Sequence, residues 1–85
     1  GAGPGRLAPL YESFCQKFTL LDSSAGQLKI AEKMVEDKSK VNIIVASAED
    51  IPLPDESYDV AVSIRMFHYI KNPEIVFQEV WKIIK

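Results

Sequence analysis

The sequence has very little of the chemistry that supports disulfides or membrane insertion. It contains one cysteine, one histidine and one tryptophan among 85 residues. A single cysteine excludes a disulfide within the chain, and Cys15 lies in an amphipathic stretch, where a packed thiol is favoured over a reactive one. No apolar run approaches the roughly 20 residues that span a bilayer, and the start lacks the apolar segment of a signal peptide. We therefore expect a cytoplasmic protein with no membrane partner.

An excess of charge of either sign is also absent. Ten basic and twelve acidic residues give a formal net charge of −2, and the lysines are scattered among the acids. This pattern argues against a basic surface for nucleic acid, so we expect no such partner. The acidic pair Asp55 and Glu56 has no histidine or further carboxylate at ligand spacing and is interpreted as a solvated turn. We predict no metal site.

What the chain has in quantity is apolar residues in alternating helical and strand patterns. Hydrophobic residues make up 47% of the sequence, which is typical of a globular domain, and 85 residues hold one domain at most. Helices are predicted over 6–17, 25–37 and 73–85, and strands over 18–22, 41–46 and 58–63, while 65–71 is ambiguous between helix and loop. Ser23, Ser24 and Asn72 are candidate helix N-caps, with Pro73 opening the last helix. This alternation predicts an α/β fold with a parallel sheet and flanking helices.

The apolar periodicity also predicts the core. We expect the thiol of Cys15 and the rings of Tyr11 and Phe14 to pack against the sheet. The remaining predicted core residues of the helices are Leu28, Ala31, Met34, Val35, Val76, Phe77, Val80, Trp81 and Ile84.

Four segments fall where open parallel sheets bind ligands, at the carboxyl ends of the strands. They are the glycine-rich turn 1–5, Asp22, the segment 47–50 and the segment 63–65. A glycine turn lets backbone approach a ligand and directs N–H groups toward it. The alternative is an ordinary loop, with Gly1 and Ala2 left over from cloning. A carboxylate such as Asp22 can accept both hydroxyl hydrogens of a ribose, or it can cap the following helix.

Together these residues resemble the class I S-adenosylmethionine-dependent methyltransferases. The most specific stretch is 46–60, with Ala48-Glu49-Asp50, then Ile51-Pro52, then Tyr58-Asp59 opening a strand. The segments 62–63, 67–70, 72–74 and 79–80 match the same family in register. The resemblance implies a partial Rossmann-like parallel sheet, the core of such an enzyme, with its first and fifth strands absent. It further implies that residues 1–85 are a fragment of a single S-adenosylmethionine-binding domain.

The resemblance also implies roles for individual residues. The glycine loop would lie under the methionine moiety, the strand-end acid would hold the ribose, and the residues after the next strand would flank the adenine. Ser47 stands where many members have an aspartate that accepts from the adenine amino group, and its hydroxyl would accept that bond more weakly. The resulting cofactor-binding set is Gly1, Ala2, Gly3, Gly5, Asp22, Ser23, Ser47, Ala48, Glu49, Ser63 and Arg65.

The catalytic residues are left open. His68 is a candidate base, but a structural role is favoured, and Tyr11 could touch the methyl donor, although its spacing favours packing. Arg65 could meet the cofactor carboxylate or lie in solvent. The implied function is methyl transfer to a small-molecule acceptor. The alternatives are an NAD-type oxidoreductase, whose fingerprint G-x-G-x-x-G differs from the spacing here, and a non-catalytic scaffold.

The implied missing strands have a consequence for the isolated chain. Without a first strand, two strand edges should be left unpaired, which allows self-association. We also expect these residues alone to bind the cofactor poorly.

Overall fold

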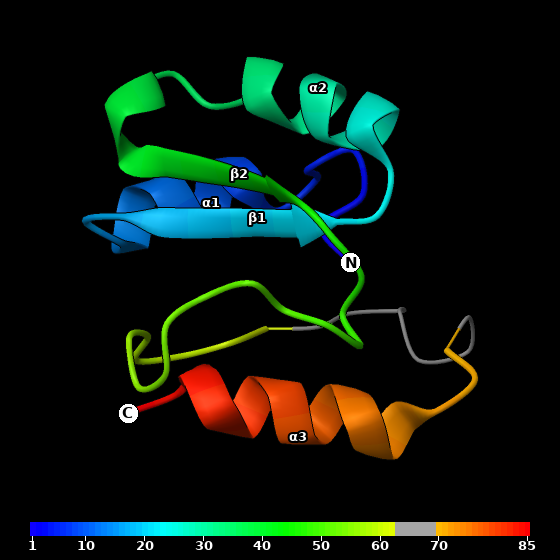
Figure 1. The fold of residues 1–85 in the computed structure, drawn as a ribbon. Helices are drawn as coiled ribbons and strands as arrows, with labels where there is room; N and C mark the ends of the chain where they lie inside the picture. Colours follow the sequence, from blue (N-terminus) through cyan, green and yellow to red (C-terminus); the bar gives the residue numbers. More distant parts are fainter. Residues whose placement is uncertain (63–69) are drawn as a thin grey trace.

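The computed structural model describes residues 1–62 and 70–85, which form an α/β arrangement with a parallel two-stranded sheet (Figure 1). Ser63, Arg65 and His68 therefore lie outside the described residues. The elements in chain order are α1 (Ala8–Phe14), β1 (Phe18–Asp22), α2 (Ala25–Lys33), a 3-10 turn η1 (Lys38–Lys40), β2 (Val41–Val45) and α3 (Pro73–Ile83). No helix in this described part of the chain is long and apolar enough to cross a membrane.

The two strands run parallel because α2 carries the chain back across the sheet between them. Their register pairs Phe18 with Val41 and Asp22 with Val45, so both strands end at the same edge. Side chains alternate along β1: Phe18 and Leu20 are buried, while Thr19 is only partly covered. The buried pair therefore faces the helices α1 and α2.

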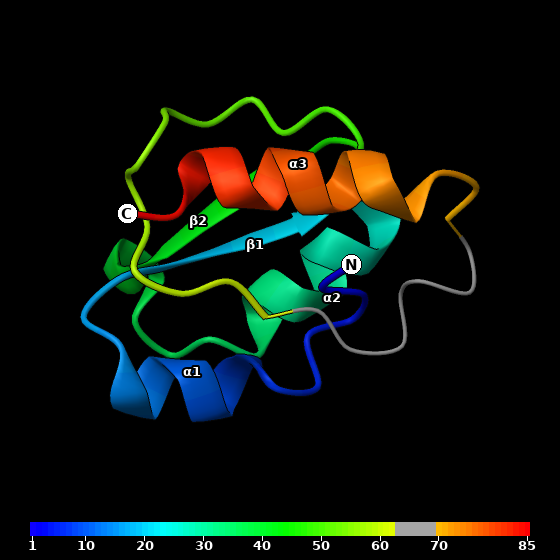
Figure 2. The same cartoon turned by 90° about the horizontal axis from the view of Figure 1, so that it is seen from below.

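The core lies between β1 and these two helices. Figure 1 shows α2 on one side of the sheet and α3 on the other, and the view from below shows α3 across the strands with α1 beside them (Figure 2). The packed cluster consists of Ala8, Phe18, Leu20, Leu28, Ala31 and Val35, with Tyr11, Cys15, Val41 and Ile43 partly buried against it. Tyr11 meets Phe18 edge to face, with ring centroids 6.4 Å apart. The predicted packing of Tyr11 and Cys15 is confirmed.

The helices are shorter than the sequence predicted, for identifiable reasons. α1 ends at Phe14 because Cys15 is already extended and leads into β1. α2 ends at Lys33, not at residue 37, because the N–H groups of Glu36 and Asp37 bond to the Glu12 carboxylate.

The predicted caps are confirmed only in part. Ser24 caps α2 by accepting from Gln27 N at 3.3 Å. Pro73 opens α3 as predicted, but the Asn72 side chain makes no capping bond, since its backbone carbonyl accepts from Ile75 N instead.

The predicted strand over 58–63 is wrong for its described part, 58–62. Here a single bridge joins Tyr58 to Ile84. A strand requires a neighbour with free N–H and C=O groups along its length. This segment instead bonds to the end of α3, with Tyr58 N donating to Ile83 O and Lys85 N donating to Tyr58 O, both at 2.9 Å. Figure 1 shows the segment between the sheet and α3.

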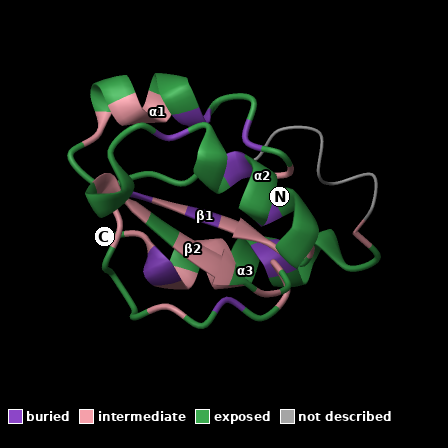
Figure 3. Ribbon diagram, turned by 90° about the horizontal axis from the view of Figure 1, so that it is seen from above, coloured by how far each residue is buried: buried purple, intermediate pink, exposed green. Residues whose placement is uncertain are grey.

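Four predicted core residues are exposed instead. Figure 3 shows buried residues on the inner sides of the helices and exposed ones outside. Phe14 is 81% exposed and Trp81 is 84% exposed, and Phe77 and Met34 are also on the surface. α1 carries two apolar stripes at helical spacing, and the one that packs contains Ala8, Tyr11 and Cys15 rather than Phe14. In α3 the buried residues are Val76 and Ile83, the second of which the sequence did not indicate.

Candidate cofactor site

Asp22 lies at the end of β1 and holds the glycine loop against it. Its Oδ2 accepts a hydrogen bond from Gly3 N, and its Oδ1 accepts one from Ser24 N, both at 2.9 Å. The second bond closes a turn before α2, but the N-cap itself is Ser24. One carboxylate oxygen thus bonds to the glycine loop and the other to the turn before α2. Each oxygen retains a lone pair that can accept from a further donor.

The electrostatics of Asp22 favour the ionised form. Burial alone would raise the pKa of its carboxyl, but hydrogen bonds from the backbone N–H groups of Ser24, Gly3 and Ser23 lower it. The pKa of Asp22 therefore falls below its ordinary value, and near neutral pH the group is an acceptor only.

The glycine loop differs from the expectation of free N–H donors. Gly1 N and Ala2 N donate to Leu21 O, Gly3 N donates to Asp22, and Gly5 N donates to Ala2 O. These four donors are therefore already used. What the loop offers is close approach of backbone, since an added Cβ on Gly3 would meet nothing within 4 Å.

Two glycines in the loop have positive φ, 57° at Gly3 and 77° at Gly5. Gly5 is buried, and an added Cβ would lie 2.5 Å from the Ala31 Cβ and 2.7 Å from its Cα. The loop is thus packed directly against the backbone of α2. The close packing of Gly5 on Ala31 fixes the position of the loop. The space beside Gly3 is open.

The segment after β2 forms the second part of this edge. Ala46 N donates to Asp22 O at 3.0 Å, which places the start of the segment beside the end of β1. Ser47 folds the segment into a turn, because its Oγ accepts from Glu49 N at 3.0 Å and its carbonyl accepts from Asp50 N at 3.1 Å. Ser47 Oγ keeps its own hydrogen to donate and a second lone pair to accept a further hydrogen bond. Ala48 and Glu49 are partly buried.

The structure brings most of the predicted site residues to one edge. The glycine loop, Asp22 and the segment 47–49 all lie where β1 and β2 end (Figure 1). Ser23 lies beside them and is exposed.

Sequence reasoning missed one residue that contacts the end of this segment. Glu79 of α3 accepts from Ile51 N at 2.7 Å, just after the segment 47–50. Glu79 and Lys82 form an i, i+3 pair, but that spacing indicates a contact within α3 and not one with Ile51.

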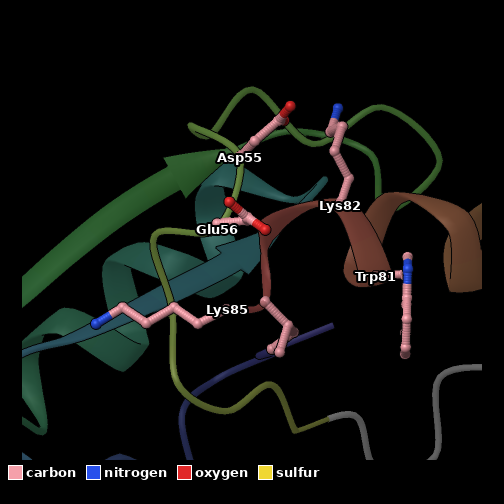
Figure 4. A pocket seen from close by; sticks show the side chains of 6 residues that line it. Asp55, Glu56, Trp81, Lys82 and Lys85 are labelled. Carbon is pink, nitrogen blue, oxygen red and sulfur yellow. The ribbon is translucent and has the colours of Figure 1, made fainter.

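A separate shallow pocket of about 340 Å³ lies away from this edge. It is lined by Asp55, Glu56, Trp81, Lys82, Ile84 and Lys85. Figure 4 shows these side chains around the end of α3, with Trp81 extending away from Glu56 and Lys85. None of the predicted cofactor residues lines it. The edge where β1 and β2 end is therefore a better candidate for the cofactor site than this pocket.

Comparison with known proteins identifies the family. The profile described as a methyltransferase domain matches residues 1–85, the whole chain. The chain belongs to the methyltransferase domain family. The predicted membership of the methyltransferase family and the predicted α/β fold of parallel strands and flanking helices are thereby confirmed.

Curated relatives of this methyltransferase domain support the same assignment. One is 2-methyl-6-phytyl-1,4-hydroquinone methyltransferase 1, chloroplastic, of Oryza sativa subsp. japonica, 36% identical over 70 residues, covering 82% of this chain and 21% of the relative. Another, from Saccharomyces cerevisiae, is described as a probable S-adenosylmethionine-dependent methyltransferase; it is 30% identical over 89 residues, covering 100% of this chain and 30% of the relative.

Solved structures agree on the fold of the methyltransferase domain. A Methanococcus maripaludis protein classed as an S-adenosyl-L-methionine-dependent methyltransferase has a TM-score of 0.90 at 26% identity, covering 100% of this chain and 41% of that one. The YcgJ protein of Bacillus subtilis has a TM-score of 0.89 at 24% identity, covering 100% and 37%. The chain thus spans less than half of each of these proteins.

Proposed function

We propose that residues 1–85 are the cofactor-binding part of a larger domain that transfers a methyl group from S-adenosylmethionine to a small-molecule acceptor. The observation that carries this is the bond from Gly3 N to Asp22 Oδ2. It joins an open glycine loop to an ionised acid at the edge where the segment after β2 begins. The proposal of a larger domain is supported by the 21% to 41% of the compared proteins that the chain covers.

Each part of the edge suits one part of the cofactor. The open space beside Gly3 accommodates the methionine moiety against backbone. The free lone pairs of Asp22 can accept from the two ribose hydroxyls, and Ser23 lies beside them. Ser47, Ala48 and Glu49 flank the adenine, with the Ser47 hydroxyl as a polar contact to the base. We extend the same proposal to Gly1, Ala2, Gly5, Ser63 and Arg65.

The chemistry requires mainly binding and orientation from these residues. When bound, S-adenosylmethionine supplies a methyl group on a sulfonium that is already a good leaving group. Holding this group in line with the acceptor supplies much of the rate acceleration. A general base is needed only where the acceptor carries a proton that must leave.

The same proposal extends to the methyl acceptor, the cellular location and self-association of the chain. The rice relative is described as a hydroquinone methyltransferase, which supports a small-molecule acceptor. The single cysteine supports a cytoplasmic location. Self-association through unpaired strand edges would be detected as a concentration-dependent mass in light scattering of the isolated chain.

Calorimetry on the full protein tests the proposed cofactor. S-adenosylhomocysteine should bind, and Asp22→Ala should weaken binding about tenfold or more, because hydrogen bonds to a charged acceptor are lost. Asp59→Ala is the matched control, since Asp59 is exposed and pairs with Lys85 at 3.2 Å, away from the site. Binding of NAD instead would contradict the proposal, and unchanged affinity in Asp22→Ala would favour a scaffold.

A further inference from the structure

The segment 47–50 is anchored at both ends, and each anchor comes from a different element. At its start, Ala46 N donates to Asp22 O of β1 at 3.0 Å. At its end, Ile51 N donates to Oε1 of Glu79 on α3 at 2.7 Å. The Ile51 side chain is buried, which keeps this second anchor in place.

Glu79 is itself held in position. Lys82, one turn along α3, lies 3.3 Å from both carboxylate oxygens of Glu79, and the Glu79 side chain is only 19% exposed. The bond from Ile51 holds the pKa of Glu79 below its ordinary value, and this outweighs the opposing effect of desolvation. The acceptor is therefore charged at neutral pH, and its contacts with Ile51 N and Lys82 Nζ hold the carboxylate in place.

Between the anchors, the hydrogen bonds that the described residues make to the segment are the short turn bonds around Ser47. Such a turn keeps its own shape but can pivot about its fixed start if its far end is released. The far end is fixed by a side chain of α3, so the placement of Ser47 and Ala48 relative to Asp22 depends on Glu79.

We propose that Glu79 is a positioning residue for the adenine end of the cofactor. It acts by holding the Ile51 N–H, and Lys82 acts through it by orienting the carboxylate. The inference rests on the proposed function, because it takes the segment 47–49 to be the part that contacts adenine. Glu79 itself touches no reacting atom.

The test compares S-adenosylhomocysteine with S-inosylhomocysteine, in which the amino group of the base is replaced by a carbonyl. Calorimetry on the full protein gives both dissociation constants and hence an adenine preference. We expect Glu79→Ala to weaken the binding of S-adenosylhomocysteine about tenfold. The adenine preference, which is the ratio of the two dissociation constants, should fall to within about twofold of unity. A loss of folded protein alone would weaken both ligands equally and leave the ratio unchanged.

Three further variants sharpen the outcome. Glu79→Gln retains an oxygen for Ile51 N–H and should keep most of the preference, so it also serves if Glu79→Ala fails to fold. Lys82→Met should have a smaller effect, and Glu74→Ala, an exposed acid in the first turn of α3, should have none. A preference unchanged in Glu79→Ala, or a wild-type preference near unity, would overturn the role of Glu79 while leaving cofactor binding intact. Absence of binding by the wild type would overturn the proposed function together with it.

Discussion

At the scale of single residues, the two left-handed glycines of the loop should respond differently to substitution. Gly5→Ala places a Cβ against the backbone of Ala31 in addition to the strain of positive φ. We expect a loss of about 2–4 kcal/mol in the free energy of unfolding. Gly3→Ala has the strain without the clash and should lose about 1 kcal/mol. Urea unfolding measures both, and equal losses would contradict the packing of the loop on α2.

The ionisation of Asp22 makes its contribution to stability dependent on pH. Because its pKa is lower in the folded than in the unfolded chain, its stabilisation is present above the unfolded pKa of about 3.9 and is lost as pH falls through the folded value. Asp22→Asn should therefore be less stable than wild type at pH 7, and the difference should shrink below about pH 4. Comparing the two proteins isolates this effect from Glu12, Asp37 and Glu79, whose pKa values are also lowered.

At the scale of elements, Glu12 joins α1 to the loop that follows α2. Its carboxylate accepts from Glu36 N at 3.1 Å and Asp37 N at 2.7 Å. Glu12→Ala should speed amide hydrogen exchange at Glu36 and Asp37, because both N–H groups lose their acceptor. Glu32→Ala, an exposed acid on α2, is the control. Unchanged amide exchange at Glu36 and Asp37 would show that Glu12 is not needed to hold the loop after α2.

The sequence predicted the existence and order of the helices and of two strands, because apolar periodicity and caps are local signals. It could not select between adjacent apolar stripes. In α1 the stripes containing Tyr11 and Phe14 have the same spacing, and only the position of β1 decides that Tyr11 packs. The end of α2 was also beyond prediction, because it depends on Glu12, 24 residues away from Glu36.

At the scale of the whole molecule, a side-chain hydrogen bond joins β1 to Tyr58 in the segment that lies against α3. Thr19 Oγ1 and Tyr58 Oη lie 2.7 Å apart. Tyr58→Phe should lower the free energy of unfolding by about 1 kcal/mol. A cycle with Thr19→Val should give a coupling of similar size, measured by urea unfolding. Additive losses would contradict the link between the layers.

Part of the candidate site could be predicted from the sequence, because neighbouring parallel strands end at the same edge of a sheet. Asp22 and Ser47 follow strands whose carboxyl ends meet at one edge, so their proximity follows from topology. The use of the loop's N–H groups within the protein, and the anchor at Glu79, depend on contacts between distant segments. No pattern within a single element specifies them.

The exposure of Trp81 has a practical consequence for spectroscopy. It is the only tryptophan in the sequence and is 84% exposed near the end of α3. Excitation of indole therefore reports on one surface position, whose emission should resemble that of tryptophan in water and be quenched readily by iodide. Figure 1 shows this end of α3 opposite the glycine loop. In the isolated chain this emission should change only when the surroundings of α3 change, which makes Trp81 an optical reporter of that helix.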